Sequence, residues 1–388
     1  MHRALLLSVA LTACSPSDPP AAPDASRPVV DAGEAADAAA STDAGEWTRD
    51  AGLDAGAVEC DPTEGPRVVA VSGALEHGAV LLLSGCGFGD RDAPGPRLYD
   101  RVDDQPAYVA AAVGDLVPVG DDAPWSRRSD NWATIPRLAD DRPRGHRARF
   151  YRVSDGDNGG DGYLGWPRAL GGTRPPPDQL RLYVSWWYRP SMDPGGGDPE
   201  GANKFIRVWD NDGAERTYVS WTHMHIGYTG GRSWTRDGRI GEWNRMEILV
   251  DAEAGTVRHY VNGVYQQVSH SSVGAFDIDD FEKDPAFAHL GLNVAVLGFD
   301  HGLTSYPDMV TDFGEIWAHT SPARVEIGDA PTWSETRHRE LQLPTSWEDG
   351  AIAVELDEGT FDTLGGRYLY VIDDRGRVNE RGLPLESR

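Results

Sequence analysis

From about residue 60 the chain consists almost wholly of short runs in which apolar and polar residues alternate, separated by glycine, proline, aspartate and asparagine. A period of two places one side of an extended segment in a core and the other toward solvent, as in β-strands. No segment keeps a 3.6-residue period over three turns, so we expect no long amphipathic helix. The predicted fold class is therefore all-β, with the strands packed as β-sandwiches. The predicted strands are Arg67–Ser72, Ala79–Ser84, Ala148–Val153, Gln179–Tyr188, Lys204–Trp209, Thr217–Tyr228, Trp243–Asp251, Val257–Val261, Ala288–Leu297, Phe313–His319, Ala351–Leu356 and Arg367–Asp373.

A tight hairpin is predicted within HYVNGVYQQV, residues 259–268. Two short alternating runs meet at Asn262-Gly263, a dipeptide that favours the positive φ angles of a two-residue turn. The stretch is also similar to a strand motif of jelly-roll alginate lyases, Tyr-x-Lys-Ala-Gly-x-Tyr-x-Gln. Here, however, it is one residue shorter and lacks the lysine and the alanine. A deletion changes which side chains share a face of a strand, so we favour the hairpin.

The N-terminal residues 1–14 are predicted to be an export signal. One arginine precedes an apolar run over 4–13, which is too short to span a bilayer and suits a signal-peptide core. The run ends in Leu11-Thr12-Ala13-Cys14, which resembles a bacterial lipobox. The resemblance implies that Cys14 is lipidated and anchors the protein outside the cytoplasm, with Ser15 favouring the outer membrane or cell surface. The alternative is an ordinary secretory signal with an incidental cysteine.

Residues 15–59 are rich in Ala, Asp and Pro and hold almost no large apolar side chain, so we expect a disordered acidic tether. The formal net charge is −26, which argues against binding to nucleic acid or to anionic membranes. We expect a monomer that meets a membrane only through its lipid anchor. If Cys14 carries lipid, Cys60 and Cys86 remain as a disulfide pair in an oxidising compartment; the alternative is two buried thiols.

The folded part is too long for one sandwich of common size. Residues 66–89 resemble the opening of an immunoglobulin-like TIG (IPT) domain, with two strands and a glycine-rich turn. Two strands cannot form a stable sheet alone, and residues 346–378 resemble later strands of the same domain type. We therefore predict an Ig-like domain divided between 60–100 and 325–388, with a jelly roll over 101–324 inserted between its halves. The alternative is that both ends add strands to one large sandwich.

Residues 101–324 resemble the concanavalin A-like lectin and glucanase fold, which includes laminin-G and polysaccharide-lyase jelly rolls. The resemblance rests on motifs in the order of that fold, namely Tyr183–Tyr188, Asn203–Trp209, Trp243–Val250 followed by the hairpin over 260–263, and Asp312–Trp317. It implies a jelly-roll β-sandwich over most of this range. It is poorly specific for function, because one fold hosts many activities.

The run KFIRVW, Lys204–Trp209, offers groups that suit a sugar. On a strand, Phe205, Arg207 and Trp209 share one face, which joins a bidentate donor to an apolar platform. The alternative is a solvated Arg and Lys with a core Trp. Residues 125–152 hold eight Arg against three Asp, a patch for an acidic polysaccharide or a solvated strand face. The candidate glycan-binding residues are Lys204, Arg207, Trp209, Trp221, Tyr228 and Trp234.

Two histidines fall on one face of the run over 217–228, together with a tryptophan. They provide a general base and a charge neutraliser, two ligands of a metal with no evident third ligand, or hydrogen-bonded groups on an open face. Jelly-roll polysaccharide lyases use a His or Tyr base with an Arg, Gln or Asn that neutralises the uronate carboxylate. If this chain is such a lyase, the resemblance implies catalytic roles for His223, His225, Arg207, Tyr260 and Tyr265.

The loop DGDNGGDG, residues 155–162, holds closely spaced oxygen ligands that suit a structural Ca²⁺. The candidate ligands are Asp155, Asp157, Asn158 and Asp161, and the alternative is an ordinary polar loop; no other cofactor is indicated. The sequence lacks the Glu-x-Asp-x-x-Glu pattern of retaining glycosidases of this fold, a Gly-x-Ser-x-Gly elbow and a P-loop.

The sequence therefore favours a lipid-anchored, extracytoplasmic glycan-binding protein with aromatic, Arg and His groups in a jelly-roll groove. The alternative is a polysaccharide lyase that cleaves an acidic, uronate-containing glycan by β-elimination. A third hypothesis is a structural or adhesive surface module.

Overall fold

The computed structural model describes residues 63–128, 136–154, 161–192, 204–209, 218–222, 225–226, 238–266, 290–300 and 309–386. Within these ranges the side chains of 161–162, 204–205, 207, 209, 218–222, 225–226 and 296–300 lie outside the description. The described residues form strands, turns and short 3-10 helices, so the predicted all-β class is confirmed. None of their helices is long and apolar enough to cross a membrane.

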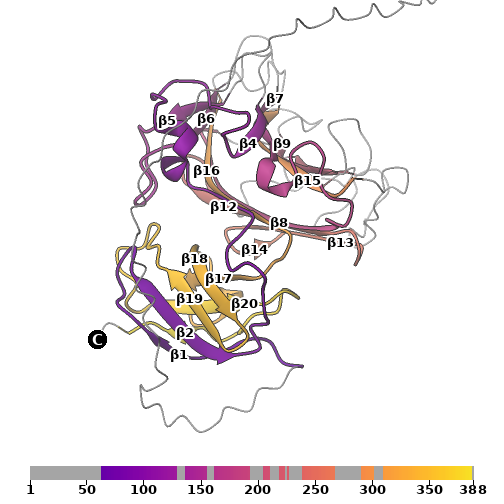
Figure 1. Cartoon of the computed structure of the whole chain (residues 1–388). Helices are drawn as coiled ribbons and strands as arrows, with labels where there is room; N and C mark the ends of the chain where they lie inside the picture. Colours follow the sequence, from indigo (N-terminus) through magenta and orange to yellow (C-terminus); the bar gives the residue numbers. More distant parts are fainter. Residues whose placement is uncertain are drawn as a thin grey trace, which may run out of the picture. The chain divides into compact units, whose positions relative to one another are not determined.

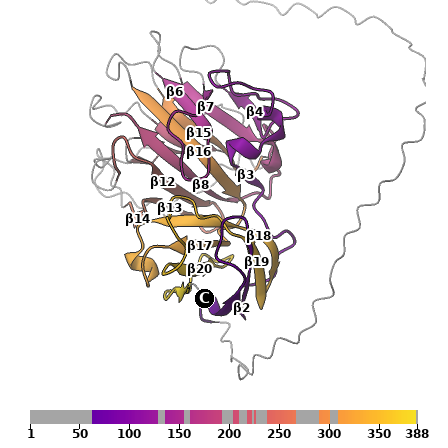
Figure 2. The same ribbon diagram turned by 90° about the vertical axis from the view of Figure 1, so that its left-hand side faces the viewer.

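The strands form three sheets, each antiparallel throughout (Figures 1 and 2). In spatial order, the six-stranded sheet contains β11 (His225–Ile226), β10 (Tyr218–Thr222), β9 (Lys204–Trp209), β15 (Asn293–Asp300), β7 (Asp161–Pro167) and β4 (Trp125–Arg128). The eight-stranded sheet contains β14 (Val264–Tyr265), β13 (Thr256–Val261), β12 (Asn244–Asp251), β8 (Arg181–Pro190), β16 (Val310–His319), β6 (Phe150–Ser154) and β5 (Arg137–Ala139), with β3 (Leu98–Asp100) also paired to β16.

The seven-stranded sheet contains β1 (Arg67–Ser72), β2 (Val80–Cys86), β19 (Ala351–Glu355), β18 (Arg339–Glu348), β17 (Arg324–Gly328), β20 (Tyr368–Ile372) and β21 (Leu383–Pro384). The 3-10 helices are η1 (Val102–Asp104), η2 (Pro106–Tyr108), η3 (Arg168–Leu170) and η7 (Trp333–Glu335).

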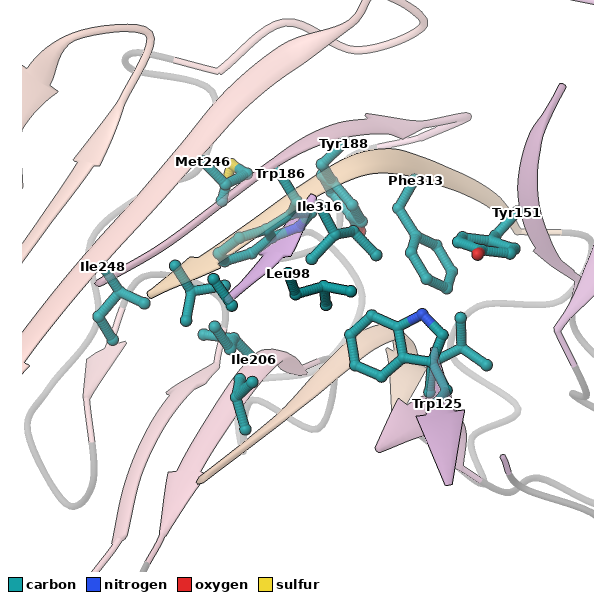
Figure 3. Packing of buried hydrophobic residues seen from close by; sticks show 14 of the residues in the cluster. Leu98, Trp125, Tyr151, Trp186, Tyr188, Ile206, Met246, Ile248, Phe313 and Ile316 are labelled. Carbon is teal, nitrogen blue, oxygen red and sulfur yellow. The ribbon is translucent and has the colours of Figure 1, made fainter. Parts of the chain in front are cut away.

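The six- and eight-stranded sheets face each other across one large core (Figure 3). Alternation along β8 explains this packing, because Leu182, Val184, Trp186 and Tyr188 are buried in the core while the residues between them point to the other face of the sheet. The core also contains one satisfied polar group. Asp100 accepts hydrogen bonds from the Trp125 indole (2.6 Å) and from the Tyr151 hydroxyl.

The seven-stranded sheet joins both ends of the described chain. Strand β2 pairs with β19 over Val80–Ser84 and Ala351–Glu355, so that indigo and yellow strands lie side by side in Figure 1. Strand β18 pairs with β17 through its first residues and with β19 through its last, with a bulge between Pro344 and Ser346. The seven-stranded sheet therefore bends over on itself and encloses a core of its own. This core is built from residues near both ends of the described chain, including Leu81, Leu83, Val325, Ile352, Val354 and Val371.

The described strands form two sandwiches: the jelly roll, made of the six- and eight-stranded sheets, and the second sandwich, made of the seven-stranded sheet. The segment that enters the jelly roll lies beside the segment that leaves it. Strand β3 enters the jelly roll and pairs with Ile316–Ala318 of β16, the strand by which the chain leaves it. Before β3, the Arg91 guanidinium donates to the Ala323 carbonyl at 3.3 Å and contacts His319. The entering and leaving segments are therefore tied to each other by backbone and side-chain bonds.

The predicted Asn-Gly hairpin is confirmed. Val261 pairs with Val264, and the two turn residues have positive φ angles, 48° at Asn262 and 74° at Gly263. The turn is also bound to β12, because the Asn262 side-chain oxygen accepts from the Arg245 amide at 3.0 Å and the Asn262 amide donates to the Arg245 carbonyl at 2.9 Å. A β-carbon added at Gly263 would lie 2.7 Å from the Thr336 carbonyl of the other sandwich.

Gly263→Ala and Gly78→Ala form a matched pair that measures this close approach. Gly78 has a similar φ of 79°, but a β-carbon there would meet nothing within 4 Å. We expect Gly78→Ala to cost about 1 kcal/mol, the strain of a left-handed residue. Gly263→Ala should cost a further ~1–3 kcal/mol, because its methyl group is overpacked against backbone. Urea unfolding measures both, and equal losses would contradict close docking of the hairpin on the second sandwich.

Candidate functional site

Several predicted glycan-binding positions lie in the six-stranded sheet. The register places Arg207 of β9 opposite Ser220 of β10, and Trp221 opposite Ile206. Thr222 of β10 lies opposite His225 of β11 and Trp221 opposite Ile226, so the strand predicted over 217–228 is wrong: β10 and β11 are two antiparallel strands, and Trp221 does not share a face with His225. Lys204 and Trp209 begin and end β9, whose Ile206 and Val208 are buried in the core. His223, Tyr228 and Trp234 lie outside the described residues.

A row of register-matched positions crosses the six-stranded sheet at Arg207. Ala295 of β15 is opposite both Arg207 and Gly165 of β7, and Gly165 is opposite Arg127 of β4. Gly165 and Ala295 are buried and small, and a β-carbon on Gly165 would meet the ring of Tyr163 at 3.3 Å. Arg127 is exposed at the far end of the row. The middle of this row thus holds small buried residues between two arginine positions, with the Tyr163 ring packed against Gly165.

The two tyrosines of the lyase hypothesis do not belong to this sheet. Tyr260 and Tyr265 pair with each other across the hairpin of β13 and β14, which lies at the edge of the eight-stranded sheet. Tyr260 lines a cavity together with Glu247 and Arg339, and Tyr265 is 45% exposed. The structure therefore does not bring either tyrosine together with Arg207.

The remaining predicted sites lie mostly outside the described residues. This holds for Asp155, Asp157, Asn158, Cys14 and Cys60, and for the side chain of Asp161. Among the described residues, no group of three or more His, Cys, Asp or Glu side chains could hold a metal. Cys86 ends β2 and is buried.

The outer face of the eight-stranded sheet is covered by the second sandwich. Tyr183 of β8 and Trp317 of β16 form a small apolar cluster with Leu341 of β18. Beside it lie five buried charged residues from both sandwiches, here called the central cluster: Arg245, Glu247, Arg324, Glu326 and Arg339.

Each carboxylate of the central cluster is bound by an arginine from the other sandwich. Arg245 of β12 donates to both oxygens of Glu326 of β17, at 2.9 and 3.0 Å. Arg339 of β18 donates to Glu247 of β12 at 2.5 Å, and the Tyr183 hydroxyl donates to the same carboxylate at 2.8 Å. Bidentate and multiply bonded ion pairs offset much of the desolvation that burial of charge costs.

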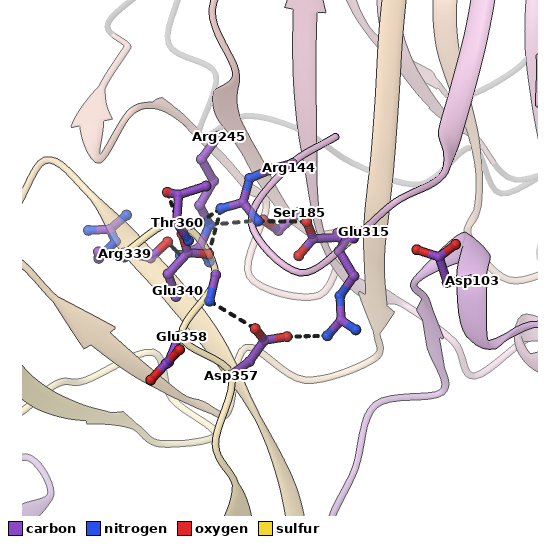
Figure 4. Close-up of polar contacts among 12 residues, drawn as sticks. Asp103, Arg144, Ser185, Arg245, Glu315, Arg339, Glu340, Asp357, Glu358 and Thr360 are labelled. Carbon is purple, nitrogen blue, oxygen red and sulfur yellow. Dashed lines mark hydrogen bonds and ion pairs between the residues drawn. The ribbon is translucent and has the colours of Figure 1, made fainter. Parts of the chain in front are cut away.

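A second group of charged residues, here called the lateral cluster, joins the two sandwiches and consists of Arg144, Glu315 and Glu340 (Figure 4). The Arg144 guanidinium donates to Glu315 at 2.6 Å and to both oxygens of Glu340 at 2.5 and 2.6 Å. It also stacks on the Trp187 ring at 3.4 Å. Glu315 lies in the irregular part of β16 with a positive φ of 48°. Neither interpretation of the basic stretch over 125–152 describes Arg144, which is buried and ion-paired rather than solvated or open to a polysaccharide.

The pKa values of the carboxyl groups in these clusters do not all shift in the same direction. Burial alone would raise the pKa of Glu326, but Arg245, Arg324 and Arg339 outweigh burial and hold this pKa well below its usual value. Burial raises the pKa of Glu315, which Arg144 only partly offsets. Three arginines against two glutamates leave the central cluster one positive charge in excess.

Sequence reasoning missed the central cluster, although a pattern marks it. Arg245-Met-Glu247 and Arg324-Val-Glu326 repeat one Arg-apolar-Glu order on two strands. In each, the middle residue is in a core and the charged residues share the opposite face. Two such strands can exchange ion pairs when their outer faces meet.

Comparison with known proteins gives distant likenesses. No family model and no curated protein matches the chain. Similar solved structures are carbohydrate-active. Domain 4 of a GH43 extracellular arabinanase from Geobacillus stearothermophilus, in complex with arabinotriose, is 13% identical over 58% of this chain and 93% of that chain, with a TM-score of 0.29.

Two further structures have the same TM-score. A family 7 alginate lyase in complex with substrate is 12% identical over 47% of this chain and 80% of that one, with a TM-score of 0.29. A structure from work on endo-acting O-glycanases of human gut microbiota that initiate mucin breakdown is 11% identical over 55% of this chain and 96% of that one, at 0.29. Similarity this low carries no argument about this chain's site.

A double-mutant cycle on Arg245 and Glu326 tests the central cluster. Arg245→Met leaves Glu326 buried with fewer cations and should cost about 3–5 kcal/mol. Arg245→Met combined with Glu326→Gln should cost less than the sum of the single changes, because the unpaired buried charge is gone. Urea unfolding at pH 7 measures the cycle, and additive losses would show that the two groups do not interact.

His259 of β13 supplies a pH test. It is fully buried, and burial lowers its pKa from 6.5 to about 3. Between these values the unfolded chain binds a proton that the folded chain does not, so stability is highest above pH 6.5 and is lost as the pH falls toward 3. His259→Gln should reduce the pH dependence of the free energy of unfolding by up to ~1.4 kcal/mol per pH unit. Unfolding free energies from pH 7 to 4 check this, and unchanged slopes would count against it.

Proposed function

We propose that this protein is a carbohydrate-binding protein whose site is the outer face of the six-stranded sheet. The observation that carries the proposal is the row Arg127–Gly165–Ala295–Arg207, with small buried residues between two arginine positions. Guanidinium groups donate in bidentate fashion to carboxylates and hydroxyl pairs of sugars. Between the two arginine positions, the Tyr163 ring packed against Gly165 offers an aromatic surface to a sugar ring.

The other face of the jelly roll is a poorer candidate. Its outer residues Tyr183, Arg245, Glu247 and Trp317 are buried beneath the second sandwich. A polymer could reach them only by separating the central cluster, which would expose the apolar contact and break several buried ion pairs. We therefore assign sugar contacts to Arg207 and Trp209 of β9, with Tyr228 and Trp234 beyond them, and add Arg127 and Tyr163. Lys204 and Trp221 are not assigned a contact, because their register positions share the face of Ile206, which is buried in the core.

The alternative is a lyase acting on a uronate glycan, and one observation favours it. Arg207 and His225 belong to the same sheet, in strands separated by β10 alone. In this alternative His225 or His223 takes the proton next to the carboxylate that Arg207 neutralises. Tyr260 and Tyr265 are not assigned a role, since they lie in the other sheet. Tyr163 of β7 is the tyrosine that we propose in their place.

The proposal includes the location of the protein. We infer that residues 1–14 direct export, that Cys14 carries lipid, and that 15–59 tether the folded part to an outer membrane or cell surface. A Cys60–Cys86 disulfide would join the end of this tether to β2. We also propose that 60–100 and 325–388 form one Ig-like domain around the jelly roll over 101–324, and that the protein acts as a monomer.

The purified protein tests the proposal on a panel of neutral and acidic polysaccharides. We expect one polymer to retard the protein in a native gel, and Arg207→Ala to weaken retardation by about tenfold or more, as loss of one charged contact should. Arg67→Ala, which removes an exposed arginine of β1, is the matched control and should bind normally.

Ultraviolet absorbance on the same panel separates the alternatives. Formation of unsaturated uronate would raise the absorbance. If His225→Ala or His223→Ala abolishes this rise, the protein is a lyase and the binding proposal is replaced. Retardation without absorbance supports binding alone. If no polymer of the panel causes retardation or a rise in absorbance, the jelly roll is a structural or adhesive module.

A further inference from the structure

A small cavity lies between the two sandwiches, beside the central cluster. Tyr183, Glu247 and Tyr260 of the eight-stranded sheet line one side of it, and Arg324, Trp333 and Arg339 line the other. Its volume is about 80 Å³. One water needs roughly 10–15 Å³ of such space, so the cavity has room for several waters or for one small polar group.

Arginine dominates the lining of this cavity. Arg324 and Arg339 are buried in its floor, where Arg324 stacks over the Tyr183 ring at 4.2 Å and Arg339 over the Trp333 ring at 4.0 Å. Arg258 and Arg375 also line it and are exposed. The two sandwiches each contribute arginines to the floor or the mouth.

The charges in and beneath this cavity do not cancel. Glu247 and Glu326 are bound by Arg245, Arg324 and Arg339, which already leaves one positive charge in excess. Among the described residues, neither the Arg258 nor the Arg375 guanidinium forms an ion pair. Five arginines therefore surround two glutamates in a protein whose net charge is −26.

The electrostatic contribution to anion binding is largest where fixed cations lie in a partly buried site, because the low dielectric constant strengthens the attraction between the charges. The volume excludes a molecule of drug size, which needs roughly 300–1,000 Å³. We propose that the cavity binds one carboxylate or sulfate group of a small acidic molecule between the mouth arginines and the arginines of the floor. This site lies on the opposite sheet from the proposed glycan face and does not depend on it.

The existing bonds define how the anion would be held. Glu247 is engaged by Arg339 and by the Tyr183 hydroxyl, so its carboxylate points into the cluster and not to a free cation at the mouth. Arg258 and Arg375 can therefore turn toward an incoming oxyanion without giving up a partner among the described residues. Binding would bridge β13 of one sandwich and the segment after β20 of the other, and so should stabilise their contact.

Isothermal titration calorimetry of the purified full chain tests the site, with sodium sulfate, sodium glucuronate and glucose as probes at constant ionic strength in chloride. We expect saturable binding of sulfate, glucuronate or both, and none of glucose. Arg258→Gln with Arg375→Gln should weaken that binding by about tenfold or more, because it removes both mouth cations. Both residues are exposed, so the variant should fold normally.

Arg67→Gln with Arg174→Gln is the matched control. It removes the same two positive charges from exposed positions that do not line the cavity, and it should bind like the wild type. Binding of glucuronate but not of sulfate would show that the site accepts carboxylates only. Binding of sulfate but not of glucuronate would show that it accepts sulfate groups only. Either result supports the proposal. Absence of saturable binding, or equal weakening in both double variants, would overturn it. Neither result depends on whether the six-stranded sheet binds a polysaccharide.

Discussion

The reciprocal ion pairs of the central cluster are the interaction on which the arrangement of the two sandwiches depends. Glu326 is held by an arginine of the jelly roll and Glu247 by an arginine of the second sandwich. The apolar contact beside them is small. A shift of one sheet over the other would leave buried charges unpaired, at several kcal/mol each, whereas an apolar contact tolerates sliding. We infer that the ion pairs fix the orientation of the sandwiches more than they add to the free energy of unfolding.

This contact assigns different tasks to the two sheets of the jelly roll. The eight-stranded sheet uses its outer face for docking, with Trp187 under the Arg144 guanidinium and Trp317 against Leu341. We propose the outer face of the six-stranded sheet as the site of glycan binding.

The fold class and the Asn262-Gly263 hairpin could be predicted because both depend on local rules, alternation and turn chemistry. The same rules place Ile206 and Val208 in the core. They do not say what covers the outer face of a sheet, because that depends on a surface distant in the sequence. The resemblance to polysaccharide lyases grouped Tyr260 with Arg207, although β13 and β9 lie in different sheets. The Arg-apolar-Glu repeat was visible, but its meaning required knowing that β12 and β17 meet.

The pairing of β2 with β19 has a consequence for synthesis. β2 begins at Val80 and its partner at Ala351, so the ribosome completes the whole jelly roll before β2 can be covered. Until then Leu81 and Leu83 lack the strands that bury them, and non-local pairing of this kind is slow to form. A chain that ends early, anywhere before β19, keeps an apolar strand with an open edge, which proteases and holding chaperones recognise. Closure of the second sandwich therefore requires that translation has passed β19.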